Sequence, residues 1–264
     1  MVTGANGFLG TWLCRTLREA GHTTQGVDRT GRPSQWLSEL HVNDLSDPAG
    51  IDLLLEKCAP DVIVHLAGIS FPPTAREKPA FVLQTNAVAT VQILEVLRRR
   101  CFAGRFIFAS SSDVYGAPDI ADLPLKEEAP LRAITPYAAT KIAAESFIRF
   151  FQNDLNITIV RPFNNIGPGQ ARQFVLPAFL ERIARALDEK QTEIQVGDLR
   201  AVRDFIDVRD LARALLSIME HPGDLPPVLN VCRGIPVTIG ELLELCCDVA
   251  RARLSFRVDP ALLR

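Results

Sequence analysis

A tyrosine and a lysine spaced four residues apart are the first candidates for chemistry. Tyr137 and Lys141 fall within 135–151, whose apolar spacing predicts a helix, so both side chains lie on one face. A neighbouring ammonium favours the phenolate and should lower the pKa of the tyrosine toward the range of an acid–base catalyst. Such pairs also occur by chance on helix surfaces, so this one predicts a site only together with other groups.

Three consecutive serines supply hydroxyl groups that could share this site. Ser110, Ser111 and Ser112 directly follow an apolar run at 105–109, which predicts a buried strand. Ligands of α/β sheets bind at the carboxyl ends of the strands, where these hydroxyls would lie. The alternative is a polar turn that only ends the strand.

A glycine-rich segment near the start of the chain has the composition of a phosphate-binding loop. Gly4, Gly7 and Gly10 are spaced G-x-x-G-x-x-G between an expected strand and an expected helix. Glycines there permit a tight turn, the approach of a pyrophosphate and close helix packing, while the helix N-terminus presents free N–H groups. The segment therefore predicts a dinucleotide site. Further candidates from the same loop are Asn6, Phe8 and Leu9.

Acidic residues follow the next two expected strands. Asp28 ends the second strand, where a carboxylate can accept both ribose hydroxyls of NAD. Arg29 follows it and could pair with the 2′-phosphate of NADP, so either cofactor is compatible. Asp44, followed by Leu45, stands where a carboxylate could meet the adenine. Both aspartates could instead cap a turn or a helix.

The elements that must position these groups alternate between helices and strands. Apolar spacing predicts helices at 8–20, 53–58, 81–100 and 135–151. Short apolar runs predict strands at 24–28, 61–67, 105–109 and 157–160. This alternation indicates βαβ units and a parallel sheet. We predict an α/β fold with a Rossmann doubly wound parallel sheet over 1–163 and a smaller C-terminal substrate-binding lobe over 164–264.

Composition limits the class of protein. The 264 residues are 47% hydrophobic and 23% charged with a net charge of −2, which is typical of a globular chain. Without a basic patch, nucleic acid is not an expected partner. We see no apolar run of about 18–20 residues and no signal-peptide pattern. The cysteines form no C-x-x-C pair. We therefore expect a cytoplasmic protein with reduced cysteines, no membrane partner and no metal.

Five ordered motifs resemble those of the extended short-chain dehydrogenase/reductases, the NAD-dependent epimerase/dehydratase family. They are TGANGFLG at 3–10, HLAG at 65–68, SSSDVYG at 110–116, YAATK at 137–141 and VRDFIDV at 202–208. Together they extend over essentially the whole chain. The resemblance implies a Rossmann domain that binds NAD or NADP and a C-terminal lobe that holds a nucleotide-diphospho-sugar.

The resemblance also implies roles for single residues. Tyr137 would exchange a proton with the sugar O4, Ser111 would hydrogen-bond the same oxygen, and Lys141 would bind the nicotinamide ribose. On the cofactor side it adds Leu66, Ala67, Gly68 and Asn86. On the substrate side it adds Ser112, Asn164 and Arg203. A guanidinium suits a diphosphate clamp, although Arg203 could instead pair with a neighbouring aspartate.

Three reactions share this frame: 4-epimerisation, 4,6-dehydration and reduction of a 4-keto sugar. A dehydratase needs further acid and base groups, and Asp113 is the acidic residue beside Ser111 that could serve. The strings at 111–116, 161–170 and 230–234 look most like GDP-6-deoxy-D-mannose reductases, which implies reduction of GDP-4-keto-6-deoxy-D-mannose to GDP-D-rhamnose. An NDP-sugar 4-epimerase, a 4,6-dehydratase and a non-catalytic dinucleotide-sensing module remain alternatives.

Relatives of this kind also imply an assembly and a typical length. Many dimerise through two long helices, so we expect a homodimer in which 81–100 and 135–151 form a four-helix bundle. They usually begin before the equivalent of Thr3 and continue past Arg264. We therefore expect a chain that is clipped at both ends, with a substrate lobe truncated at its C-terminus.

Overall fold

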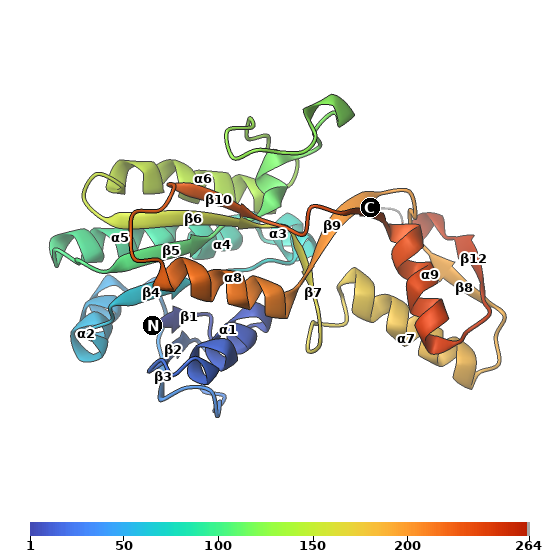
Figure 1. Ribbon diagram of the computed structural model, residues 1–264, viewed down its shortest axis with the longest axis horizontal. Coiled ribbons are helices and arrows are strands. Elements are labelled where there is room, and N and C mark those ends of the chain that lie inside the picture. Colours follow the sequence, from blue (N-terminus) through green and yellow to red (C-terminus); the bar gives the residue numbers. More distant parts are fainter. Residues whose placement is uncertain (263–264) are drawn as a thin grey trace. The chain divides into compact units, whose positions relative to one another are not determined.

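The computed structural model describes residues 1–262 and divides the chain into two compact units. The first unit comprises Met1–Phe163 and Val208–Val231. The second unit comprises Asn164–Asp207 and Cys232–Arg264. Because the chain crosses between the units three times, each unit is built from separate stretches of sequence (Figure 1).

A seven-stranded parallel sheet forms the centre of the first unit (Figure 1). Its strands are β1 (Val2–Thr3), β2 (Gln25–Asp28), β3 (Glu39–Val42), β4 (Val62–His65), β5 (Arg105–Ala109), β6 (Asn156–Pro162) and β10 (Val228–Val231). The order is β10-β6-β5-β4-β1-β2-β3, and all neighbouring pairs are parallel. The strand order reverses between β1 and β4, which is the switch point of a Rossmann sheet. The predicted α/β fold is confirmed.

Helices cover both faces of this sheet. The longer ones are α1 (Phe8–Glu19), α2 (Pro48–Cys58), α5 (Ala89–Arg99), α6 (Pro136–Phe151) and α8 (Val208–Glu220). The shorter ones are α3 (Pro72–Glu77), α4 (Pro79–Leu83), the π-helical turn η1 (Gln84–Val88) and the 3₁₀ turns η2 (Ser112–Tyr115) and η3 (Ile120–Asp122). Residues of α1 and α8 share one apolar cluster, and residues of α2, α5 and α6 share another.

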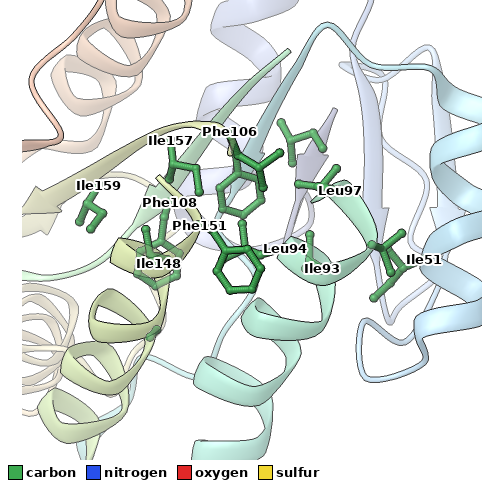
Figure 2. Close-up of a cluster of buried hydrophobic side chains, with 14 of the residues drawn as sticks. Ile51, Ile93, Leu94, Leu97, Phe106, Phe108, Ile148, Phe151, Ile157 and Ile159 are labelled. Atoms are coloured by element: carbon green, nitrogen blue, oxygen red, sulfur yellow. The ribbon is translucent and has the colours of Figure 1, made fainter. Parts of the chain in front are cut away.

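The core between the sheet and helices α2, α5 and α6 is built from alternate strand residues (Figure 2). Phe106 and Phe108 of β5 lie in it with Leu94 of α5 and Ile148 of α6. Ile107, between the two phenylalanines, belongs to the cluster that contains α1 and α8. Since successive side chains of a strand point to opposite faces, both faces of β5 are apolar, as a parallel sheet covered on both sides requires.

Helices α4, η1 and α5 run on without a break from Pro79 to Arg99. This stretch is long and apolar enough to cross a membrane by length and composition, and half of it is buried inside the structure. Polar residues such as Gln84 and Asn86 interrupt this stretch, so the sequence shows no unbroken apolar run there. Its residues Ile93, Leu94 and Leu97 pack in the core of the first unit, so it serves there as a core helix.

Among the residues described, the second unit contains two small sheets, two α-helices and a 3₁₀ turn. Its strands are β7 (Asn164–Ile166), β8 (Glu193–Val196), β9 (Val202–Asp207), β11 (Pro236–Thr238) and β12 (Ser255–Val258). Its helices are α7 (Val175–Asp188), α9 (Ile239–Ala250) and the 3₁₀ turn η4 (Pro260–Leu262). Strands β11, β9 and β7 form one sheet, and β12 pairs with β8. Helices α7 and α9 share an apolar cluster with β8 through Phe179, Ile194 and Leu243.

The structure differs from the sequence analysis at 208–231, which was expected in the C-terminal lobe. This segment folds with the first unit. Strand β10 pairs with β6, with Val228 opposite Ile159, and Leu215 of α8 packs in the same cluster as Leu13 of α1. Strand β10 covers the edge of β6, whose backbone N–H and C=O groups would otherwise be unpaired. Pairing between distant segments therefore decides where 208–231 folds.

Removing side-chain volume from the core of the first unit should destabilise the protein. Leu94 is 0% exposed, so we expect Leu94→Ala to lower the free energy of unfolding by about 2–5 kcal/mol. Leu53 is 69% exposed on α2, and Leu53→Ala should change it by no more than about 0.5 kcal/mol. Urea unfolding followed by circular dichroism measures both. Equal losses in the two variants would contradict this description of the core.

Candidate active site

The glycine-rich loop between β1 and α1 is packed so closely that it has no room for side chains at two positions. Gly4 has a φ of +67°, and a Cβ there would lie 2.8 Å from the backbone nitrogen of Ala67. A Cβ at Gly10 would lie 2.1 Å from the carbonyl oxygen of Gly4. These two glycines therefore fix the tight turn and the close approach of α1 that the sequence predicts.

The N-terminus of α1 is left without a side-chain cap. Gly7 is its N-cap residue and makes no side-chain cap hydrogen bond. By contrast, Asp47 caps α2 and Thr135 caps α6 through side-chain oxygens. The backbone N–H groups in the first turn of α1 and the positive end of its dipole suit a pyrophosphate, so this cradle fits a dinucleotide cofactor.

Asp28 ties the end of β2 to this loop. Its carboxylate accepts the backbone N–H of Asn6 at 3.1 Å, and both the N–H and the hydroxyl of Thr30 at 3.0 and 2.9 Å. A carboxylate has about four acceptor positions, so Asp28 retains capacity for a ribose hydroxyl. Asn6 donates to the carbonyl oxygens of Thr30 and Arg32, and Arg29 lies exposed beside them. The loop thus offers a carboxylate and a guanidinium to the adenosine end of a cofactor.

The structure places Asp44 in a local turn. Its carboxylate accepts the N–H and the hydroxyl of Ser46 at 3.0 and 2.8 Å. These two hydrogen bonds, with a smaller effect of the Arg29 charge, hold the pKa of Asp44 below its usual value. Leu45 is half-buried and packs against two core clusters. The alternative weighed in the sequence analysis, a turn residue, accounts for these contacts of Asp44.

The HLAG motif follows β4 and lies against the glycine-rich loop. The backbone N–H of Ala67 donates to the hydroxyl of Thr3 at 3.2 Å, and Leu66 is half-buried in the cluster that contains α1. A Cβ at Gly68 would lie 3.0 Å from Oδ1 of Asn86 and 3.7 Å from Nζ of Lys141. The structure therefore brings Gly68, after the end of β4, close to Asn86 of η1 and to Lys141 of α6.

Asn86 positions this segment through its own hydrogen bonds. It lies in the π-helical turn η1, where Oδ1 accepts the N–H of Ile69 at 2.7 Å. Its Nδ2 donates to the carbonyl of Ile69 at 3.0 Å and to the hydroxyl of Thr140 at 3.1 Å. Asn86 thus joins the loop after β4 to helix α6, which defines the space beside Gly68.

Tyr137, Lys141 and Ser111 come together at the carboxyl end of β5. Tyr137 is buried and hydrogen-bonded to Ser111. Lys141 donates from Nζ to the carbonyl oxygen of Ala109, the last residue of β5, at 2.8 Å. Ser111 also accepts the N–H of Asp113 at 3.2 Å, which begins the 3₁₀ turn that contains Ser112. The arrangement presents a phenol, a hydroxyl and an ammonium at one end of the sheet.

The protonation of this pair differs from the sequence-based expectation. Burial raises the pKa of Tyr137 and the charge of Asp113 adds to the rise, while the hydrogen bond to Ser111 opposes it. Burial also lowers the pKa of Lys141 to about 8, against the opposing charge of Glu145. The predicted lowering of the tyrosine pKa is therefore wrong, because desolvation, which the sequence does not reveal, is the largest effect. At neutral pH Tyr137 therefore carries its proton.

Sequence analysis missed a buried ion pair behind these residues. Nη2 of Arg161 lies 2.6 Å from Oε2 of Glu145, and both side chains are inaccessible to solvent. Glu145 stands one helical turn after Lys141, so the i, i+4 spacing could have revealed it. Arg161 gave no such signal, because it lies within β6 and pairs with Glu145 only through tertiary packing.

The expected substrate residues Asn164 and Arg203 lie in the second unit. Asn164 is half-buried at the start of β7, opposite Phe205 of β9. Arg203 is exposed on β9, and its Nη1 donates to the carbonyl of Val202 at 2.7 Å. The carboxylate of Asp204 accepts two backbone N–H groups, from residues 233 and 234, at 2.9 and 2.6 Å. Asp204 thus caps the turn before β11.

Comparisons with known proteins identify the family of the chain. The sequence profile of the NAD dependent epimerase/dehydratase family matches residues 1–232. GDP-6-deoxy-D-mannose reductase from Pseudomonas aeruginosa is 38% identical over 266 residues, which cover 100% of this chain and 84% of the relative. The crystallised RMD from Pseudomonas aeruginosa, complexed with NADPH, has a TM-score of 0.83 at 36% identity, covering 99% of this chain and 87% of that one.

An epimerase is also similar to the chain. UDP-glucose 4-epimerase from Mycolicibacterium smegmatis is 31% identical over 259 residues, which cover 92% of this chain and 79% of the relative. The similarity to reductases and to epimerases agrees with the site geometry, since both reactions need a phenol and a dinucleotide cradle.

The close packing at Gly10 gives a direct test of the cofactor cradle. Gly10→Ala forces a Cβ to within 2.1 Å of the Gly4 carbonyl oxygen, so the loop must shift. We expect the Kd for NADPH or NADH to rise by at least about tenfold, equivalent to about 1.4 kcal/mol. Fluorescence titration of the reduced cofactor measures this effect.

A matched control for this substitution is Gly223→Ala. The added Cβ would lie 3.6 Å from Cε1 of His221, an ordinary contact, so cofactor affinity should stay unchanged. Equal affinities in the two alanine variants would show that the close approach at Gly10 is not needed for binding.

Proposed function

The chain belongs to the NAD dependent epimerase/dehydratase family, and on that premise we propose that it reduces the C4 ketone of GDP-4-keto-6-deoxy-D-mannose to GDP-D-rhamnose. The protein is an NAD(P)-dependent enzyme of nucleotide-sugar metabolism, with NAD or NADP as its cofactor. The observation that carries the proposed substrate is the 38% identity, over the whole chain, to GDP-6-deoxy-D-mannose reductase.

The cofactor would be held by the elements at the carboxyl edge of the first four strands. The reduced nicotinamide supplies the hydride when it is bound. The backbone of 4–10, with Asn6, Phe8 and Leu9, would hold the pyrophosphate at the start of α1. Asp28 and Arg29 would bind the adenosine ribose, and Asp44 and Leu45 would lie near the adenine. The path to Lys141 would be lined by four residues: Leu66, Ala67, Gly68 and Asn86.

Reduction needs a proton at O4, and Tyr137 is the group that can supply it. Because burial and Asp113 raise the pKa of Tyr137, the phenol is protonated at neutral pH and can donate. Ser111, already hydrogen-bonded to Tyr137, would bind the same oxygen. Lys141 would bind the nicotinamide ribose through its ammonium, which its partners hold beside β5. O4 of the product alcohol gains the proton of Tyr137. The Tyr137 phenolate then takes up another proton from solvent.

The nucleotide sugar would also contact residues outside this catalytic group. Ser112 lies next to Ser111 in η2 and could bind the sugar. We propose that Asn164 and Arg203 bind the nucleotide diphosphate from the second unit, because both belong to motifs of the family and Arg203 presents an exposed guanidinium. In this proposal the first unit binds the cofactor and the second unit binds the nucleotide.

A second candidate is 4-epimerisation of a nucleotide sugar, favoured by the 31% identity to UDP-glucose 4-epimerase. An epimerase uses the same phenol first as a base and then as an acid, and its cofactor is not consumed. The two candidates therefore differ in whether the reduced cofactor disappears as product forms.

The surface of the first unit supports a homodimer. Exposed apolar side chains lie on the helix of α4, η1 and α5 and on α6: Phe81, Leu83, Val88, Phe147 and Phe150. Large exposed apolar patches mark interaction surfaces, and these are the two helices expected in a four-helix bundle. We also propose a cytoplasmic location, where the six cysteines would stay reduced.

A Tyr137→Phe variant tests the proposed chemistry. The wild-type protein should oxidise NADPH or NADH when GDP-4-keto-6-deoxymannose is added, followed by the absorbance of the reduced nicotinamide. Removing the phenolic hydroxyl should lower kcat by about 10²–10⁴-fold, while cofactor binding is retained. Undiminished turnover in this variant would refute the role of Tyr137. Interconversion of UDP-hexoses without net cofactor oxidation would favour the epimerase.

A charge placed on the exposed face of α6 tests the dimer. Phe150 is 75% exposed, and Phe150→Asp should convert the dimer to a monomer, because two carboxylates would be buried in the bundle. Leu53→Asp, on the exposed side of α2, is the control and should leave the dimer intact. Sedimentation velocity at micromolar concentration distinguishes these states, and a monomeric wild-type protein would contradict the proposal.

A further inference from the structure

A buried polar network lies directly behind the candidate catalytic residues of the first unit. At its centre the carboxylate of Glu145 accepts two hydrogen bonds from Arg161, from Nε at 3.0 Å and from Nη2 at 2.6 Å. The side chains of Glu145 and Arg161 are 0% and 1% exposed. A buried charge is costly unless it is paired and hydrogen-bonded, so removing one partner of this pair would leave the other charge uncompensated.

Two further N–H groups of Arg161 donate within the protein. Its Nη1 donates to the hydroxyl of Tyr115 and to the carbonyl of Glu127, both at 2.8 Å. The hydroxyl of Tyr115 in turn donates to Oδ1 of Asn230 at 2.7 Å. Because its hydrogen bonds go to buried protein groups, Arg161 serves to hold Glu145 and does not reach toward a substrate.

Glu145 is linked to the catalytic group in two ways. Its Oε1 accepts the hydroxyl of Ser110 at 2.5 Å, and Ser110 immediately precedes Ser111. On α6 it stands one turn after Lys141, so the carboxylate and the ammonium lie on the same face of the helix. A single carboxylate therefore fixes the start of the serine turn and acts on the charge of Lys141.

The groups around Lys141 leave Glu145 as the carboxylate that favours its charged form. On the side of β4, Lys141 faces His65, which is fully buried. Burial lowers the pKa of His65 to about 3, so this imidazole is neutral. From β5 it faces the carbonyl of Ala109 and the ring of Phe108, whose centroid is 4.8 Å from Nζ. From α6 it faces Tyr137, which is protonated, and Glu145, whose charge opposes the effect of burial.

We propose that Glu145, held in place by Arg161, is a positioning residue of the active site: it keeps Lys141 in the ammonium form and fixes Ser110 so that Ser111 meets Tyr137. The inference rests on the proposed reductase function, since it assigns Glu145 a part in that reaction. Glu145 acts through Lys141 and Ser111 and does not itself touch substrate.

The first test replaces the carboxylate by an amide of the same size, in Glu145→Gln. Without the anion, the pKa of Lys141 should fall below its value of about 8. The alkaline limb of the pH profile of kcat should then move to lower pH by about one unit. At pH values above the pKa of Lys141, kcat should therefore be about tenfold lower than in the wild type. The KM for the sugar nucleotide should stay within about twofold, because the amide touches no substrate.

The pKa of Lys141 can be measured directly by NMR of protein labelled with ¹³C at the lysine ε-carbons. Lys141 is the buried lysine among the five, since the other lysines are all exposed: Lys57, Lys78, Lys126 and Lys190. This titration uses the free protein and needs no substrate.

A second variant guards against misfolding, because Glu145→Gln leaves the Arg161 charge unpaired. Combining it with Arg161→Met removes both charges, and such replacements commonly fold. The pKa of Lys141 should remain below that of the wild type in this double variant. Glu39→Gln is the control: it removes an exposed carboxylate that pairs with Lys57 on the same unit, and it should leave the Lys141 titration and the pH profile unchanged.

The outcomes separate the two proposals. A Lys141 pKa and a pH profile that match the wild type in the double variant would overturn the role of Glu145 and leave the pair as a structural ion pair. A wild-type protein without reductase activity would overturn the proposed function instead. The NMR titration then still decides whether Glu145 sets the charge of Lys141, with a lower pKa in the variants in favour and an unchanged pKa against.

Discussion

The hydrogen bond from the Lys141 ammonium to the carbonyl of Ala109, 2.8 Å long, joins helix α6 to the end of strand β5. The Lys141 side chain is buried, and a buried ammonium is tolerated only where oxygen atoms or a ring receive it. This requirement fixes the position of α6, along its own axis, relative to the end of β5. Tyr137, one turn earlier, is thereby placed beside Ser111 at the end of the same strand.

The parallel order of the sheet turns this local contact into a complete site. Because all strands point the same way, the glycine-rich loop after β1, Asp28 at the end of β2, Gly68 after β4 and Ser111 after β5 lie along one edge. The cradle for a dinucleotide stands at the switch between β1 and β4, and the phenol stands one strand further along. Burial of Tyr137 then keeps its proton in place for donation.

Local patterns in the sequence predicted the elements and most of the candidate site, whereas long-range packing decided what they missed. The i, i+4 spacing of Tyr137 and Lys141 is a property of one helix, so it could be read directly. The pKa of Tyr137 depends on how deeply α6 is buried, which spacing does not reveal. The pairing of Glu145 with Arg161 and the return of 208–231 to the first unit join distant segments, and neither leaves a periodic signal.

We propose that this edge of the sheet directs a hydride to C4 of a nucleotide sugar while Tyr137 protonates O4. The most direct test is to supply GDP-4-keto-6-deoxymannose with a nicotinamide cofactor that carries deuterium at its transferable position, and to examine the product by NMR. We expect a 6-deoxyhexose with deuterium at C4, in an amount equal to the cofactor oxidised. A product without deuterium at C4, or a cofactor that stays reduced while the sugar is converted, would contradict it.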